Sequence, residues 1–146
     1  MATQVLTAEE VSTFLRDRVE NNHLLDTVEF PPTIINLAIE LAISEFNSIP
    51  PMSQHNLLDF PSKSILLSGT LYKMFSGQCA LMARNHMEYS DGGLTIPVEE
   101  RFQLYTALAG MYQSDFQNSA RAIKTQMNLD SGWGGVSSVY GYLPIW

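Results

Sequence analysis

Residues 97–127 read PVEERFQLYTALAGMYQSDFQNSARAIKTQM and contain the longest regular pattern of the chain. Apolar side chains recur in this stretch at spacings of three and four, which is the period of one face of an α-helix. Pro97 suits the first helical position, where a backbone N–H has no partner within the helix. The pattern predicts a helix of about 30 residues, roughly 45 Å long. The residues expected on its buried face are Val98, Phe102, Tyr105, Ala109, Tyr112, Phe116, Ala120, Ile123 and Met127.

Three further apolar residues, Leu104, Leu108 and Met111, lie beside that face. They make the apolar surface wider than one neighbouring helix would cover. We therefore expect this helix to contact more than one neighbour, and a helix of another subunit is a candidate.

Two helices are expected in the first 51 residues. Thr7 and Glu10 have the spacing of a capping box, so a first helix should begin there and end at Asn21-Asn22. A second helix should begin at Pro31-Pro32 and end at residues 47–51, where Asn47-Ser48-Ile49-Pro50-Pro51 stops the pattern. The residues expected to face inward are Val11, Phe14, Leu15 and Val19 in the first helix, and Ile34, Leu37, Ala38, Leu41, Ala42 and Phe46 in the second.

A third helix is expected to open at Pro61-Ser62 and to contain Gly69 and Gly77. Because glycine lowers helix propensity, close approach of another helix is the simplest reason for both glycines. The turn signal Tyr89-Ser90-Asp91-Gly92-Gly93 then reverses the chain before the long helix. The residues expected to face inward are Ile65, Leu66, Leu71, Met74, Phe75, Cys79, Met82 and His86.

The last 17 residues, 130–146, alternate glycine with aromatic and aliphatic side chains and contain no charge after Asp130. The glycine content argues against a helix, and the aromatic content argues against a solvated disordered tail. The segment is therefore expected to dock, either on its own helices or on a neighbouring molecule. The candidate interface residues are Trp133, Val136, Val139, Tyr140, Tyr142, Leu143, Ile145 and Trp146. The expected fold is thus mainly α, with residues 1–129 forming a bundle of about four helices and residues 130–146 forming an extended aromatic and glycine-rich C-terminal docking arm.

The formal net charge of -7 disfavours a partner that is bound through its phosphates. Residues 1–60 hold nine acidic and two basic residues, whereas residues 61–146 hold six of each. A face built from the first segment would repel DNA and attract a basic protein surface. No apolar stretch is long enough for a membrane span, and the N-terminus lacks the pattern of a signal peptide.

The sequence shows no pattern typical of a catalytic or metal site. The three histidines, His23, His55 and His86, include no pair at the i, i+4 spacing that lets two imidazoles on one helix share a metal ion. The contexts of Ser68 and Ser76 lack the G-x-S-x-G elbow of serine hydrolases. Cys79 is the only cysteine and lies within an apolar helix pattern, where thiols are usually inert. We expect neither an enzyme nor a bound metal or cofactor.

Four short segments of the N-terminal third suggest a family: VSTFLRDR (11–18), NNHLLD (21–26), VEF (28–30) and EFNSIPP (45–51). Together they resemble the opening of head-to-tail connector proteins of tailed bacteriophages. The turn at residues 89–93, followed by a long final helix, adds to the resemblance.

The resemblance implies a structural virion protein of the viral neck, made in the host cytoplasm. Such a subunit forms a ring, commonly a dodecamer, between the portal protein and the tail or neck proteins, and genome DNA passes through its channel. A tail terminator or another tail or neck component is an alternative within the same class. From a different class, a small helical regulatory protein that binds a host target is the alternative.

Overall fold

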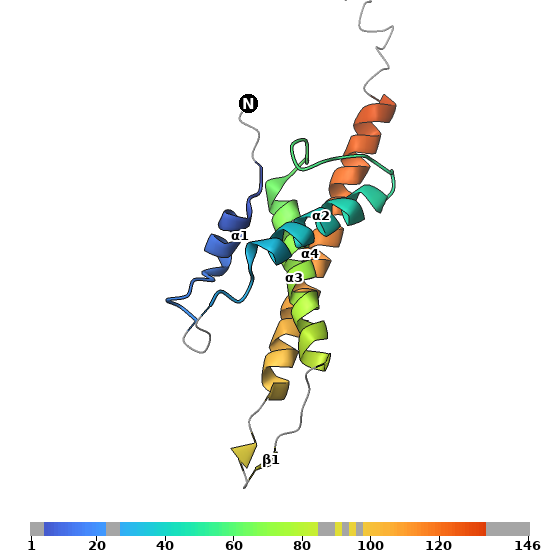
Figure 1. Ribbon diagram of the computed structural model, residues 1–146. Helices are drawn as coiled ribbons and strands as arrows, with labels where there is room; N and C mark the ends of the chain where they lie inside the picture. Colours follow the sequence, from blue (N-terminus) through green and yellow to red (C-terminus); the bar gives the residue numbers. More distant parts are fainter. Residues whose placement is uncertain (1–4, 23–26, 85–89, 92–93, 96–97, 134–146) are drawn as a thin grey trace, which may run out of the picture.

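The computed structural model describes residues 5–22, 27–84, 90–91, 94–95 and 98–133 (Figure 1). Its elements are four helices, α1 (Ala8–Leu15), α2 (Pro32–Ser48), α3 (Lys63–Arg84) and α4 (Val98–Trp133), and two short strands, β1 (Ser90–Asp91) and β2 (Leu94–Thr95). The strands form an antiparallel pair between α3 and α4 in the chain. The predicted mainly helical fold with four helices is confirmed for the described residues.

Helices α3 and α4 form an antiparallel hairpin along the length of the molecule (Figure 1). Helix α2 crosses this hairpin, and α1 lies beside the first turns of α2. The paired strands lie at one end of the hairpin, and the last turns of α4 project at the other. The surfaces available for binding therefore belong mainly to the outer sides of three packed helices.

The hydrophobic core lies where α2 crosses the hairpin. The ring of Phe75 is in edge contact with Phe30, at a centroid distance of 6.0 Å, and stacks on Tyr112 at 5.8 Å. A second, smaller cluster packs Phe46, Ile65, Phe116 and Ala120 together toward the C-terminal part of α4. Burial of these large side chains supplies most of the stabilising free energy of such a small domain.

Gly69 is the point of closest approach between α3 and its neighbours. A Cβ atom placed on Gly69 would lie 2.7 Å and 2.8 Å from two ring atoms of Phe116, and 3.0 Å from Cβ of Ala42. Only a residue without a side chain fits there, so the predicted packing reason for this glycine is confirmed. For Gly77 the prediction is wrong within the part of the chain that the structure describes, because a Cβ atom there would meet no atom of another helix within 4 Å.

Helix α1 begins as predicted and ends earlier than predicted. The capping box is present, with the Glu10 amide donating to Thr7 Oγ1 at 3.2 Å and the Thr7 amide donating to Glu10 Oε2 at 3.0 Å. The helix stops at Leu15, because Arg16 adopts a left-handed conformation (φ 54°, ψ 30°) that closes the last turn. Phe14, which lies within the helix, and Val19, which lies beyond its end, are expected inside from the sequence but are exposed.

Helix α2 buries a different face from the predicted one. Ala38, Ala42 and Phe46 are buried as expected, but the other core residues are Ile35 and Ile39. The residues wrongly expected in the core are exposed, namely Ile34, Leu37 and Leu41. Helix α2 is apolar on two sides, so periodicity alone cannot say which side meets α3.

Helix α4 has 36 residues and continues through Asp130 to Trp133, so the prediction that residues 130–133 are not helical is wrong. The side chain of Gln126 donates to Asp130 Oδ1 at 2.8 Å, which supports the last turns at the i, i+4 spacing. Ala109, Phe116 and Ala120 of the predicted stripe are buried. Phe102, which was also expected inside, is exposed.

Candidate assembly surfaces

The predicted tail anchors lie at or beyond the end of α4. Trp133 is the last residue of the helix. The others fall outside the described residues: Val136, Val139, Tyr140, Tyr142, Leu143, Ile145 and Trp146. The structure places candidate binding surfaces elsewhere on the subunit, on α2, α3 and α4.

A groove of about 340 Å³ runs between α2 and α3. On the α2 side it exposes Ile34, Leu37 and Leu41, whose exposed fractions are 45%, 56% and 46%. On the α3 side it contains Leu81, which is 43% exposed, and the open position Gly77. Several large aliphatic side chains that share one exposed groove are typical of a protein–protein contact rather than of scattered surface residues.

Basic residues lie on the α3 wall of this groove. Lys73 lies one turn before Gly77, and Arg84 follows Leu81 by three residues, so all four face the same side of α3. Lys73 forms an ion pair with Glu45 of α2, with a distance of 2.5 Å between Nζ and Oε2. The groove thus has an apolar middle and a cationic group toward each end of its α3 wall.

A second exposed apolar surface lies on α4, and we call it the α4 stripe. It consists of Leu104, Leu108 and Met111, which follow one another at spacings of four and three, and the exposed fraction of Leu104 reaches 64%. Asp115 continues the same line one turn later and accepts a hydrogen bond from Ser68 Oγ at 2.5 Å. The predicted widening of the apolar face of α4 is therefore present, and within the subunit much of it remains uncovered.

A hollow of about 320 Å³ lies between the end of α1 and α4. The Tyr105 hydroxyl donates a hydrogen bond there to the Glu29 carboxylate. Burial, reinforced by that carboxylate, raises the pKa of Tyr105 well above its ordinary value. The phenol therefore stays protonated at neutral pH and acts as a fixed donor that joins the segment before α2 to α4.

Asp17 shapes the same region from the α1 side. The residue is only 7% exposed, and its carboxylate accepts hydrogen bonds from the backbone amides of Glu29 and Phe30 at 2.9 Å and 2.7 Å. The side chain of Asn22 donates a third bond to the carboxylate at 2.6 Å. Asp17 thus folds the segment before α2 back onto the end of α1.

Asp17→Asn is expected to destabilise the fold by about 1–3 kcal/mol, because the amide has one acceptor oxygen for these three donors. Urea denaturation measures the change in the free energy of unfolding. Asp130→Asn, at an exposed position of α4, is the matched control and should change stability by less than about 0.5 kcal/mol. Equal effects of the two substitutions would contradict the role given to Asp17.

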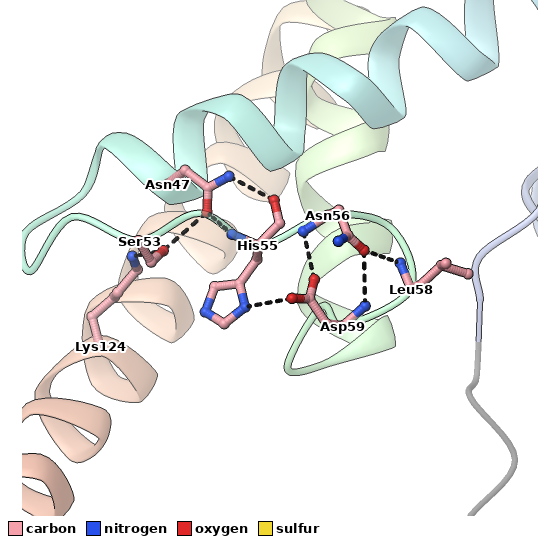
Figure 2. Close-up of polar contacts among 7 residues, drawn as sticks. All are labelled: Asn47, Ser53, His55, Asn56, Leu58, Asp59 and Lys124. Carbon is pink, nitrogen blue, oxygen red and sulfur yellow. Dashed lines mark hydrogen bonds and ion pairs between the residues drawn. The ribbon is translucent and has the colours of Figure 1, made fainter.

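The loop between α2 and α3 is held by a part-buried polar cluster (Figure 2). Asn47 is at its centre: its amide nitrogen donates to the His55 carbonyl at 2.8 Å, and its oxygen accepts from Ser53 Oγ and the His55 amide, both at 2.9 Å. Lys124 reaches the loop from α4, with Nζ 2.9 Å from the Pro51 carbonyl oxygen and 2.5 Å from Ser53 Oγ. The cluster therefore ties the loop to α4.

Lys124 is 1% exposed, which is exceptional for a lysine. Its Nζ lies 4.6 Å from the centroid of the Phe46 ring, which attracts a cation through the electrons of the ring face. Burial nevertheless lowers the pKa of Lys124 from its ordinary value of 10.5, because the charged form loses water.

The contact between Ser53 and Lys124 brings together a hydroxyl and an amine, as in serine–lysine hydrolases. Two observations favour a structural role instead. Ser53 directs its own proton to Asn47, and Lys124 has almost no access to solvent. Neither residue lines the groove or the hollow described above. The cluster is therefore best explained as a clamp on the loop.

The described residues contain no group of three or more His, Cys, Asp or Glu side chains that could hold a metal ion. His55 Nδ1 lies 3.9 Å from Asp59 Oδ2. Cys79 is half-buried, with Sγ 3.5 Å from Thr106 Oγ1. Among the described helices, none is both long and apolar enough to cross a lipid bilayer.

No protein-family model matches the chain. No curated protein and no solved structure is significantly similar to it either. Evidence on function comes instead from the surfaces of the chain itself. The clearest of these are the groove between α2 and α3 and the α4 stripe.

Proposed function

We propose that the chain is a non-enzymatic structural subunit of the head-to-tail connector of a tailed bacteriophage. In this proposal, copies of the subunit form a ring, commonly of twelve, in the virion neck between the portal protein and the tail. Genome DNA passes through the channel of the ring.

The observation that supports this proposal best is the presence of two separate apolar surfaces on one small subunit. The groove lies on α2 and α3, whereas the α4 stripe lies on a third helix. A subunit that joins two neighbours through different surfaces forms head-to-tail contacts, and these close into a ring when the rotation between copies permits.

The charge distribution supports the same proposal. The excess of acidic residues lies in residues 1–60. Acidic side chains along a channel repel the phosphates of passing DNA and prevent it from binding. The aromatic residues of 134–146 supply a third means of attachment, to the portal, an adjacent subunit or a tail component, since aromatic anchors dominate many interfaces.

The test is native mass spectrometry of the protein alone and mixed with portal rings from the same source. We expect a stoichiometric ring on the portal for the full-length chain. A variant ending at Trp133 keeps all of α4 and removes only the segment that follows, and we expect it to lose most of this binding.

Other outcomes separate the alternatives. Binding to tail-tube subunits instead of portal rings would favour a tail terminator. A monomer or dimer that never assembles with portal or tail components would overturn the connector proposal and favour a host-directed regulatory protein. Normal ring formation by the truncated variant would refute the anchor role of residues 134–146 alone.

A further inference from the structure

We infer that the groove between α2 and α3 receives the α4 stripe of a second copy of the chain. The inference rests on the proposed ring and names the contact between its adjacent subunits. It assigns Leu104, Leu108 and Met111 to one side of that contact. On the other side it assigns Ile34, Leu37, Leu41, Gly77 and Leu81.

The two surfaces match in chemistry and length. The α4 stripe is a line of three apolar side chains on one helix, about 10 Å long, and Leu104 and Leu108 also line the hollow beside α1. The groove is an apolar channel between two helices with a volume of about 340 Å³. An apolar helix face lying in a groove between helices is a recurrent mode of recognition, with contacts at the i, i+4 and i+7 positions.

Gly77 gives independent support. It lies within α3, where glycine weakens a helix, yet apart from the adjacent backbone of α3 itself no atom of the described residues comes within 4 Å of its Cβ position. Gly69, eight residues earlier, shows what a glycine in this helix does when another helix packs against it, since the Phe116 ring occupies the space beside it. Gly77 leaves the same kind of space open in the wall of the groove, where a side chain from another subunit can enter.

The charges agree with the same pairing. The α3 wall of the groove contains Lys73 and Arg84 on either side of Gly77 and Leu81. The α4 stripe continues into Asp115 one turn beyond Met111. Lys73 already forms an ion pair with Glu45 of its own chain, so Arg84 is the cation that the Asp115 carboxylate approaches, which favours one direction of the stripe in the groove.

Within one subunit the two surfaces cannot meet. Helix α4 packs on the side of α3 marked by Gly69, whereas the Cβ position of Gly77 points to open space. Each copy therefore offers its groove to one neighbour and its stripe to another. Because the two surfaces differ, the contact continues from copy to copy until a ring closes.

Disulfide cross-linking tests the contact directly. In a Cys79→Ser background, which removes the only native thiol, Gly77→Cys with Leu108→Cys should give a ladder of covalent oligomers on mild oxidation. Each single-cysteine variant has no partner thiol across the contact and should give no cross-link beyond a trace of dimer from random collisions. Gly77→Cys with Gly110→Cys is the matched control, because residue 110 lies two positions along α4 and faces another direction, and it should give no ladder.

A mixing experiment provides a second measurement. Leu37→Asp damages the groove and leaves the stripe intact, whereas Leu108→Asp does the reverse, and both residues are exposed enough for the subunit to fold. Neither variant should oligomerise alone. Mixed in equal amounts, they should form a one-to-one dimer that grows no further, because only one intact contact can form.

The outcomes separate this inference from the proposed function. A ladder no stronger than the control, in samples that form rings on the portal, would overturn the contact and leave the connector proposal standing. A ladder in a protein that never binds portal or tail components would support the contact and overturn the connector proposal. Absence of any self-association, alone or with the portal, would overturn both.

Discussion

Gly69→Ala is expected to destabilise the fold by about 1–3 kcal/mol, although alanine is the better helix former. The added methyl group would lie 2.7 Å from a ring atom of Phe116, and neither partner can move away easily. The Phe116 side chain is fully buried in a packed cluster, and the Gly69 backbone lies inside α3. The free energy of unfolding in urea is the quantity to measure.

Gly77→Ala is the matched control on the same helix. Its methyl group would meet no neighbouring element among the described residues, so the substitution should stabilise the isolated chain by up to about 1 kcal/mol. The double variant Gly69→Ala with Phe116→Leu should lose less stability than the sum of the two single substitutions, because the smaller side chain leaves room for the methyl group. Destabilisation by both alanine substitutions, or by neither, would contradict the packing described at Gly69.

Lys124→Met is expected to destabilise the fold by about 1–3 kcal/mol. Methionine keeps an apolar stem of similar length, so the loss comes mainly from the Pro51 carbonyl and the Ser53 hydroxyl, which lose their donor in a buried site. Lys124→Ala removes the stem as well and should cost about 1 kcal/mol more through the cavity that it leaves. Lys63→Met is the control, since the ion pair of Lys63 with Glu10 is partly exposed and should contribute less than about 1 kcal/mol.

The same lysine should leave a signature in the pH dependence of stability. Burial lowers the pKa of Lys124 in the folded state below its ordinary value of 10.5. Between these two values the unfolded chain binds more protons than the folded one, so the free energy of unfolding rises with pH. This rise should appear in the difference between the wild-type protein and Lys124→Met, and a flat difference up to pH 10.5 would contradict it.

The starts of the helices could be predicted from the sequence because local chemistry determines them. The capping box of Thr7 and Glu10 and the proline at the start of α2 act within one turn of the chain. The end of α1 is different. Arg16 closes it in a left-handed conformation, and Asp17, the next residue, accepts bonds from amides 12 and 13 residues later, which no local pattern reveals.

The candidate surfaces could be predicted only in part. The apolar line of Leu104, Leu108 and Met111 could be predicted, because these residues make the apolar face of the helix wider than its predicted buried stripe. The groove was not, because Leu37 and its neighbours formed an equally regular stripe and were assigned to the core. Only the direction from which α3 approaches decides between the two faces of α2.

The burial of Lys124 could be predicted from the periodicity of the helix. It lies four residues after Ala120 and eight after Phe116, both fully buried, so its position is in phase with the core. A charged residue at such a position is expected to find polar partners, and here they come from the loop between α2 and α3. The sequence does not reveal which distant carbonyl and hydroxyl groups accept its hydrogen bonds.

In the proposed ring, residues 134–146 act as a ligand tethered to the projecting end of α4. Met127 is the last half-buried residue of this helix, and residues 128–132 are all exposed, so the helix runs about 9 Å beyond its packed part before Trp133. A segment attached at that point would meet a neighbouring copy of the proposed ring at an effective concentration in the millimolar range. Sites too weak to hold a free peptide would then still be occupied by the attached segment, so a peptide of residues 134–146 added in solution should compete poorly.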